Sequence, residues 1–336
     1  MKRLYIHVPF CVKKCLYCDF YSITDNSLID DYIKAVIRNI PDMKFDTLYF
    51  GGGTPSLLTA SQIAAIIEAA NPTTTAEISM ECNPQSSGLE YFREIRKAGV
   101  NRLSIGIQSL HDETLRKLGR LHDSDTAVKT VYDAYEAGFE NISADIMLGV
   151  SDTRDSAKLC KLPLKHISAY MLKVEKNTPF YSMENLNLPD EDSVCDAYLE
   201  AVETFRENGF MQYEISNFAK AGYECKHNLG YWECEEYIGI GPSAHSYSGG
   251  KRFAVPREIN AFIEADTQPT YITDENPGGI DERLMLGLRL MQKGVVCNKN
   301  VDRYVKAELL RKQGDTIFLT PKGALVSNSI ITDLVY

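Results

Sequence analysis

The feature that most constrains the fold is a regular alternation of short apolar segments and helical patterns over the first two-thirds of the chain. Several of the short segments are continuously apolar, which is typical of strands that are covered on both faces. The expected strands cover residues 4–8, 47–50, 77–81, 102–107, 142–147, 166–172 and 211–215. The helical patterns between them cover about residues 27–40, 60–70, 88–98, 123–137 and 191–208. A strand followed by a helix, repeated six or more times, predicts an α/β fold with a parallel sheet, either doubly wound or curved into a barrel.

The positions of the polar segments favour the barrel. A cysteine-rich loop, a glycine-rich turn at residues 51–54, and the side chains of Glu81, Gln108 and Asp145 each come at or just after the end of an expected strand. In a barrel the C-terminal ends of all the strands surround one mouth. We therefore expect these groups to converge on one ligand.

The alternation stops after about residue 250. Helical patterns at 257–265, 280–291 and 299–312 are followed by a polar, hairpin-like segment at 314–323. We expect a barrel domain over residues 1–250 and a small helical or winged-helix-like domain over residues 251–336.

Composition excludes several classes of protein. With 44% hydrophobic and 24% charged residues the chain is an ordinary globular one, and its apolar runs are shorter than the ~18 residues that span a bilayer. No apolar stretch typical of a signal peptide follows Met1, so a cytoplasmic location is expected. The net charge of −10 argues against a surface that binds nucleic acid.

Three of the nine cysteines lie close together, at Cys11, Cys15 and Cys18, on the loop after the first strand. An odd number of cysteines without an export signal does not suggest a disulfide framework. Three thiolates on one loop can bind three irons of a [4Fe–4S] cluster and leave the fourth iron without a protein ligand, although such clusters usually have four cysteines. Zinc, with His7 or a distant cysteine as fourth ligand, is the alternative, but the second cysteine pair common in zinc sites is not evident.

The Cys-x-x-x-Cys-x-x-Cys spacing, with Tyr17 just before the third cysteine, resembles that of the radical S-adenosylmethionine (SAM) enzymes. The resemblance implies a partial (βα)6 TIM-like barrel in which SAM chelates the open iron of a [4Fe–4S] cluster. One electron from the cluster then cleaves SAM to methionine and a 5′-deoxyadenosyl radical. It also implies that Gly53 and Thr54 belong to the turn that receives the methionyl amino group.

Longer motifs extend the resemblance over nearly the whole chain. They lie at residues 5–11, 51–55, 81–84, 104–109 and 118–120 and at Asp145. They resemble the branch that holds the oxygen-independent coproporphyrinogen III oxidases and the HemW-type haem chaperones. This resemblance assigns no catalytic residue, but it implies SAM contacts by Tyr5, Tyr17, Gly53, Thr54, Glu81, Gln108, Arg120 and Asp145.

Three features favour the chaperones over the oxidases. The chain has almost no extension before the first strand, Asp19 and Phe20 stand where the oxidases carry a Gly-Cys pair, and residues 227–232 resemble the chaperone group. That last segment holds the single tryptophan and His227. Because imidazole can bind haem iron, His227 is a candidate haem ligand, and a buried structural histidine is the equal alternative.

The resemblance implies a protein that binds haem as cargo and delivers it to apo-haemoproteins of respiration. A reductant donor such as flavodoxin or ferredoxin, a homodimeric form and a peripheral association with the membrane belong to the same expectation, which leaves open whether SAM is cleaved. One alternative is oxidative decarboxylation of coproporphyrinogen III. The other is a zinc-stabilised binding protein without radical chemistry.

The chain departs from the family after Asp145. Only about fifteen residues precede the next expected strand, too few for the usual helix and its two loops. We therefore expect a thin outer layer of the barrel at this point.

Overall fold

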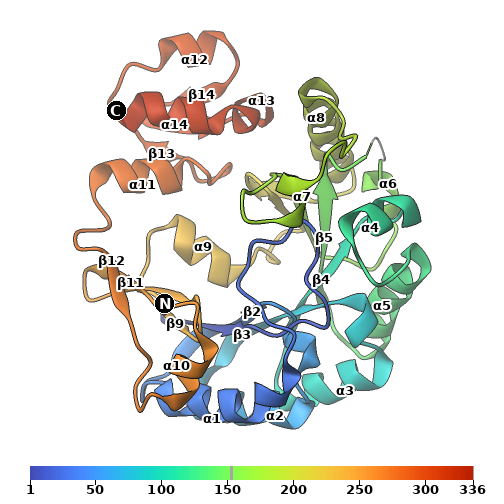
Figure 1. Ribbon diagram of the computed structural model, residues 1–336. Coiled ribbons are helices and arrows are strands. Elements are labelled where there is room, and N and C mark those ends of the chain that lie inside the picture. The colour runs from blue at the N-terminus through green and yellow to red at the C-terminus, as the bar shows by residue number, and fades with distance from the viewer. Residues whose placement is uncertain (152–153, 336) are drawn as a thin grey trace.

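The computed structural model describes residues 1–151 and 154–335, and a nine-stranded sheet forms most of its N-terminal part (Figure 1). Six strands follow one another in the sheet in chain order, and every neighbouring pair of them is parallel. They are β1 (Arg3–Val8), β2 (Phe45–Gly52), β3 (Pro72–Cys82), β4 (Arg102–Gln108), β5 (Asn141–Leu148) and β6 (His166–Met171). This order confirms the α/β fold and is that of a (βα)6 partial barrel.

The two edges of the sheet differ. At one edge β9 (Ile238–Ile240) pairs with β1 in parallel. At the other edge β8 (Asn217–Ala219) is antiparallel to both β6 and β7 (Met211–Glu214). The seventh expected strand therefore exists but is not parallel, because the two residues between β7 and β8 allow only a hairpin, whereas a parallel crossover needs a dozen residues or more.

Helices cover the outer side of the six parallel strands (Figure 1). After β1 to β4 come α1 (Ile29–Asn39), α2 (Ala60–Ala70), α3 (Leu89–Ala98), α4 (Asp112–Leu118) and α5 (Ser124–Glu136). Alternate strand residues such as Leu4, Ile6 and Val8 are fully buried on this side and join the main core. The helical layer therefore accounts for the apolar half of each strand pattern.

The inner side of the sheet is polar. The residues of β4, β5 and β6 that line the interior cavity include Arg102, Ser104, Asp145, His166 and Ser168. TIM-barrel interiors are commonly filled by layers of branched apolar side chains. Here polar side chains leave room for a polar ligand instead.

In the described part of the connection between β5 and β6 the only helix is the four-residue α6 (Ser156–Leu159), in agreement with the short connection expected there. The long helix α8 (Glu191–Glu207), which follows β6 and the short α7 (Pro179–Ser182), packs against α6 and β5. A later helix thus supplies the outer layer at this point. Asp152, in the same connection, lies outside the described residues.

The remaining chain forms two small antiparallel sheets. The first consists of β10 (His245–Ser248), β11 (Lys251–Ala254) and β12 (Tyr271–Asp274), and α10 (Ile259–Glu264) packs beside α1. The expected domain boundary between residues 250 and 251 falls inside the hairpin of β10 and β11. We propose that the smaller unit begins instead at α11 (Ile280–Gly287).

The second small sheet has the order β13 (Val295–Val296), β15 (Thr316–Leu319), β14 (Leu310–Gln313). With α11, α12 (Asp302–Lys306), α13 (Pro321–Leu325) and α14 (Ser327–Val335) it forms a winged-helix-like unit at the C-terminal end (Figure 1). The helix expected over 299–312 is wrong in extent, because α12 ends at Lys306 and a strand begins at Leu310. None of the helices in the described part of the chain is long and apolar enough to cross a membrane.

Candidate functional site

A cavity of about 690 Å³ lies at the C-terminal ends of the parallel strands, a size typical of small-molecule sites. Ten of the twelve residues singled out from the sequence line it: Cys11, Cys15, Tyr17, Cys18, Gly53, Thr54, Glu81, Gln108, Arg120 and Asp145. The other two, Tyr5 and His227, are not among its lining residues. Elements more than 100 residues apart in the chain therefore converge as the barrel predicts.

Backbone hydrogen bonds of Leu16 anchor the cysteine loop. Its backbone N–H donates to the Leu118 carbonyl at 3.2 Å, and its carbonyl accepts from the Phe180 N–H at 3.0 Å. Leu118 and Phe180 form the centre of a second apolar cluster, against which Leu16 and Tyr17 pack. The ends of α4 and α7 thus hold the loop over the cavity.

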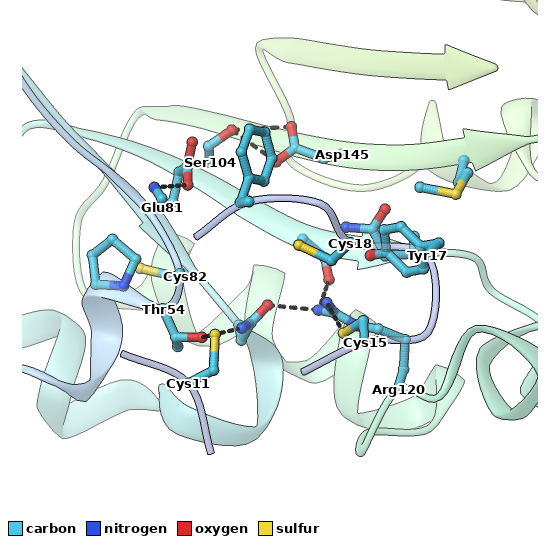
Figure 2. A pocket seen from close by; sticks show the side chains of 18 of the residues that line it. Cys11, Cys15, Tyr17, Cys18, Thr54, Glu81, Cys82, Ser104, Arg120 and Asp145 are labelled. Atoms are coloured by element: carbon cyan, nitrogen blue, oxygen red, sulfur yellow. Dashed lines mark hydrogen bonds between the residues drawn. The ribbon is translucent and has the colours of Figure 1, made fainter. Parts of the chain in front are cut away.

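The three thiols face the cavity from different places (Figure 2). Cys11 accepts a hydrogen bond from the Thr54 hydroxyl at 3.5 Å, and Cys15 accepts one from Arg120 Nη1 at 3.5 Å. Within residues 1–151 and 154–335 no three His, Cys, Asp or Glu side chains are grouped closely enough to hold a single metal ion.

Asn83 connects the partners of these two thiols. Its Nδ2 donates to Thr54 Oγ1 at 2.9 Å, and its Oδ1 accepts from Arg120 Nη2 at 2.6 Å. The same Nη2 donates to the Gly106 carbonyl at 2.6 Å. A continuous chain of side chains, which follow β2, β3 and α4, thus fixes Thr54 and Arg120 next to Cys11 and Cys15 (Figure 2).

The glycine turn after β2 is tightly packed against the cysteine loop. A Cβ on Gly53 would lie 2.7 Å from the Phe10 carbonyl oxygen, and Gly52 has a φ of +109° that favours glycine. The N–H groups of Gly53 and Thr54 already donate to the carbonyls of Val8 and Phe10. The backbone of this turn therefore offers a ligand its carbonyl oxygens, which can accept hydrogen bonds from an ammonium group.

Glu81 on β3 and Asp145 on β5 both line the cavity, and Ser104 of the intervening strand β4 lies between them. Glu81 accepts from the Tyr49 hydroxyl at 3.0 Å and from the Gly52 N–H at 3.1 Å, while Asp145 accepts from the Ser104 hydroxyl at 3.0 Å. Burial raises the pKa of both carboxyls, that of Glu81 to about 7, and the charge of Asp145 is the second cause for Glu81. The site therefore favours a cationic or hydroxyl-rich ligand that stabilises both carboxylates.

The pKa of Glu81 predicts a pH dependence of stability. Because its folded-state pKa of about 7 exceeds the ordinary value of 4.5, the folded protein holds this proton where the unfolded chain has released it. The free-energy contribution of Glu81 to folding therefore falls as pH rises from 4.5 to 7. We expect the free energy of unfolding of Glu81→Gln to rise relative to that of the wild type by up to about 3 kcal/mol across this pH range, because one pKa unit corresponds to 1.36 kcal/mol. Denaturant unfolding of ligand-free protein at several pH values measures the difference, and a constant difference would contradict the assignment.

Two predicted SAM contacts have distinctive positions. Gln108 lines the cavity and has a φ of +62°, an unusual backbone conformation that is common at functional sites. Tyr5 is not a lining residue but packs beside the wall: a Cβ on Gly51 would stand 2.9 Å from its ring and 3.1 Å from Glu81 Oε1, and its hydroxyl contacts His7 Nδ1 at 3.1 Å. From there Tyr5 supports the cavity wall at Glu81.

His227 lies on α9 (Lys226–Trp232) and is only 1% exposed. Both ring nitrogens are engaged, Nδ1 with the Thr47 hydroxyl at 2.8 Å and Nε2 with the Tyr231 hydroxyl at 2.8 Å. Burial lowers the pKa of His227 to about 3, so the ring is neutral. To bind iron, His227 would have to break a buried hydrogen bond, and we propose a structural role for it.

Sequence reasoning missed Asn83, Ser104, Ser168 and Tyr170 as cavity residues. Asn83 and Ser104 lie inside motifs that were recognised. The available signal was the alternation of side chains along a strand. Residues two positions apart point to the same face of the sheet, so residues two positions from Glu81, Gly106 and Asp145 share the inner face with them.

Comparison with known proteins agrees with these motifs. The family model described as the radical SAM superfamily matches residues 5–162. A Bacillus subtilis protein named heme chaperone HemW is 32% identical over 376 residues, covering 98% of this chain and 98% of the relative. The chain belongs to the HemW family of radical SAM proteins.

Further similarities support this membership of the HemW family. An Escherichia coli protein, also named heme chaperone HemW, is 36% identical over 261 residues, covering 72% of this chain and 69% of the relative. The solved structure of coproporphyrinogen III oxidase (HemN) from Escherichia coli aligns with a TM-score of 0.80 over 99% of this chain and 90% of its own, at 20% identity. At that identity the likeness shows the radical SAM barrel fold alone.

Membership of the family implies a [4Fe–4S] cluster and SAM, and the residues present fit both groups. Three free thiols border the cavity at separate points, as a cluster with one open iron requires. The buried Nε of Arg120 has no hydrogen-bond partner in the described part of the chain, so the guanidinium keeps a donor for a ligand.

Proposed function

We propose that this chain binds haem and delivers it intact to apo-haemoproteins of respiration. The observation that carries the proposal is similarity along almost the full length to a protein named heme chaperone HemW. The cavity supports it, because the three cysteines, the glycine turn and the two carboxylates all belong to its lining.

In the proposed protein, Cys11, Cys15 and Cys18 hold the cluster. When bound, the cluster supplies an electron and an open iron site to SAM. Arg120 and Thr54 donate hydrogen bonds to two of the cysteine sulfurs and so stabilise them as thiolates.

The remaining polar residues would orient SAM. The carbonyls of the glycine turn accept from its amino group, and Glu81 and Asp145 accept from hydroxyl or ammonium donors. Arg120 Nε can donate to a carboxylate. These roles place the SAM charges opposite groups of complementary charge.

The family relation is also the basis for three further proposals. We propose that the protein works in the cytoplasm, that it receives electrons from a donor such as flavodoxin or ferredoxin, and that two copies form a homodimer. Size measurements and reduction by each donor under anaerobic conditions test the last two.

The proposed function is tested by two assays on anaerobically reconstituted protein. Haem titration should give a saturable Soret shift with about one haem per chain. Incubation with coproporphyrinogen III, SAM and a reductant should give no vinyl-bearing product, since the proposal is delivery rather than conversion. Absence of haem binding, or steady multiple turnover of coproporphyrinogen III, would make the proposal wrong.

A further inference from the structure

The mouth of the cavity gathers cationic side chains on an acidic protein. The chain carries a net charge of −10, yet Lys13, Lys14, Lys173 and Arg257 all line the cavity and are exposed. Lys173 pairs with Glu175 at 2.6 Å. Within the described residues, Lys13, Lys14 and Arg257 form no ion pair.

Exposed apolar side chains line the same mouth. Phe20 is 66% exposed and Leu121 is 49% exposed, although both belong to the cavity lining. An aromatic ring left in solvent beside a ligand cavity is available to stack on a flat ligand. We name the group formed by Lys13, Lys14, Phe20, Leu121 and Arg257 the rim.

The rim combines two features that few ligands match. Unpaired ammonium and guanidinium groups bind carboxylates, whereas Phe20 and Leu121 bind an apolar surface. Haem has both: a flat apolar macrocycle and two propionate carboxylates on one edge.

We propose that the rim is the haem site of this chain, with the propionates bound by Lys13, Lys14 and Arg257 and the macrocycle lying against Phe20 and Leu121. This inference rests on the proposed function and names where the cargo binds. The haem lies over the cavity mouth, so it covers the SAM pocket beneath. His227 takes no part, because both of its ring nitrogens are engaged in the interior.

Haem bound at the rim is expected to affect the dissociation of SAM from the cavity. A flat ligand across the mouth obstructs the exit of SAM bound below it. We therefore expect haem to slow SAM dissociation severalfold in a chase with unlabelled SAM. An unchanged dissociation rate with haem bound would contradict a site over the mouth.

Charge reversal tests the propionate contacts. We expect Lys13→Glu/Lys14→Glu to raise the Kd for haem about tenfold at low ionic strength, and Arg257→Glu about threefold, the scale of exposed ion pairs. The matched control is Lys44→Glu/Lys97→Glu, which changes net charge equally at exposed positions outside the cavity lining. Because Lys13 and Lys14 lie between cluster cysteines, iron content is measured in each variant, and Arg257→Glu tests the contact from outside that loop.

Haem dimethyl ester, in which both propionates are uncharged, distinguishes the contribution of the ion pairs to haem binding from that of the apolar contacts. The wild type should bind the ester about tenfold more weakly than haem. Lys13→Glu/Lys14→Glu should bind both about equally, whereas Arg257→Glu should still bind haem about threefold more tightly than the ester. Phe20→Ala should weaken the binding of haem and ester by the same factor.

The outcomes distinguish this inference from the proposed function. If the wild type binds no haem at all, the proposed function itself is wrong. If it binds haem but the rim variants and the ester bind equally well, the rim assignment alone is wrong. Loss of the Soret shift in a folded His227→Gln variant would also overturn the rim assignment and place the haem at α9.

Discussion

Replacing Cys15 with alanine is expected to remove the cluster from anaerobically purified protein. Iron should fall from about four per chain to near zero, and the brown colour should disappear, because two thiolates cannot retain a cubane that three hold. Cys11→Ala and Cys18→Ala should behave alike, since all three thiols border the same cavity. Iron analysis and visible spectroscopy measure the effect.

The matched control for this prediction is Cys195→Ala. Cys195 is a partly exposed free thiol on α8 that does not line the cavity, so its loss should leave the iron content unchanged. Stoichiometric zinc without iron in the wild type would instead support a zinc-stabilised protein and contradict the cluster.

Replacing Asp145 with asparagine is expected to weaken SAM binding by about 1–3 kcal/mol, the scale for a hydrogen bond to a charged group. The variant keeps the side-chain shape and can still accept from Ser104, so the barrel should fold and the cluster should remain. Anaerobic equilibrium dialysis with labelled SAM measures the affinity.

Asp155→Asn is the control for this second prediction. Asp155 is a buried carboxylate that accepts from the Ser109 hydroxyl at 2.7 Å, and it is not a cavity-lining residue. Its replacement should leave SAM affinity nearly unchanged. If Asp145→Asn binds SAM as tightly as the wild type while retaining its iron, Asp145 is not a SAM contact.

The convergence of the site could be predicted because strand ends are marked in the sequence. Glu81, Gln108 and Asp145 come at or near the ends of apolar runs, and a barrel brings such ends together. The position of Tyr5 is not marked in the same way. Tyr49, its partner in register, lines the cavity, and so does Arg102 at the same level on β4, so depth along the barrel axis does not separate Tyr5 from the site. The ring of Tyr5 instead lies against Gly51, and only the packed structure shows this.

The role of His227 could not be read from its motif. His227 and Tyr231 are four residues apart and therefore share one helix face, which is equally typical of a ligand pair and of a buried contact. Only the packing of α9 against β2 turns that face toward Thr47.

The wrong extent of the expected helix near the C-terminus has a local cause. Apolar residues at 301, 304, 305 and 309 follow a helical period, so a helix over 299–312 was expected. Glu308 has a φ of +58°, which ends the helical path, and Gly314 has a φ of +60° in the turn that pairs β14 with β15. Long-range pairing thus overrides the local pattern.

The central claim, delivery of intact haem, is tested most directly by transfer to an acceptor. Haem-loaded, cluster-reconstituted protein is mixed anaerobically with an apo-haemoprotein of respiration, the two are separated, and the haem on each is quantified and weighed by mass spectrometry. We predict that about one haem per chain moves to the acceptor with unchanged mass, and faster than it reaches an unrelated haem scavenger. Transfer no faster than to that scavenger, or recovery of a chemically altered tetrapyrrole, would contradict the account.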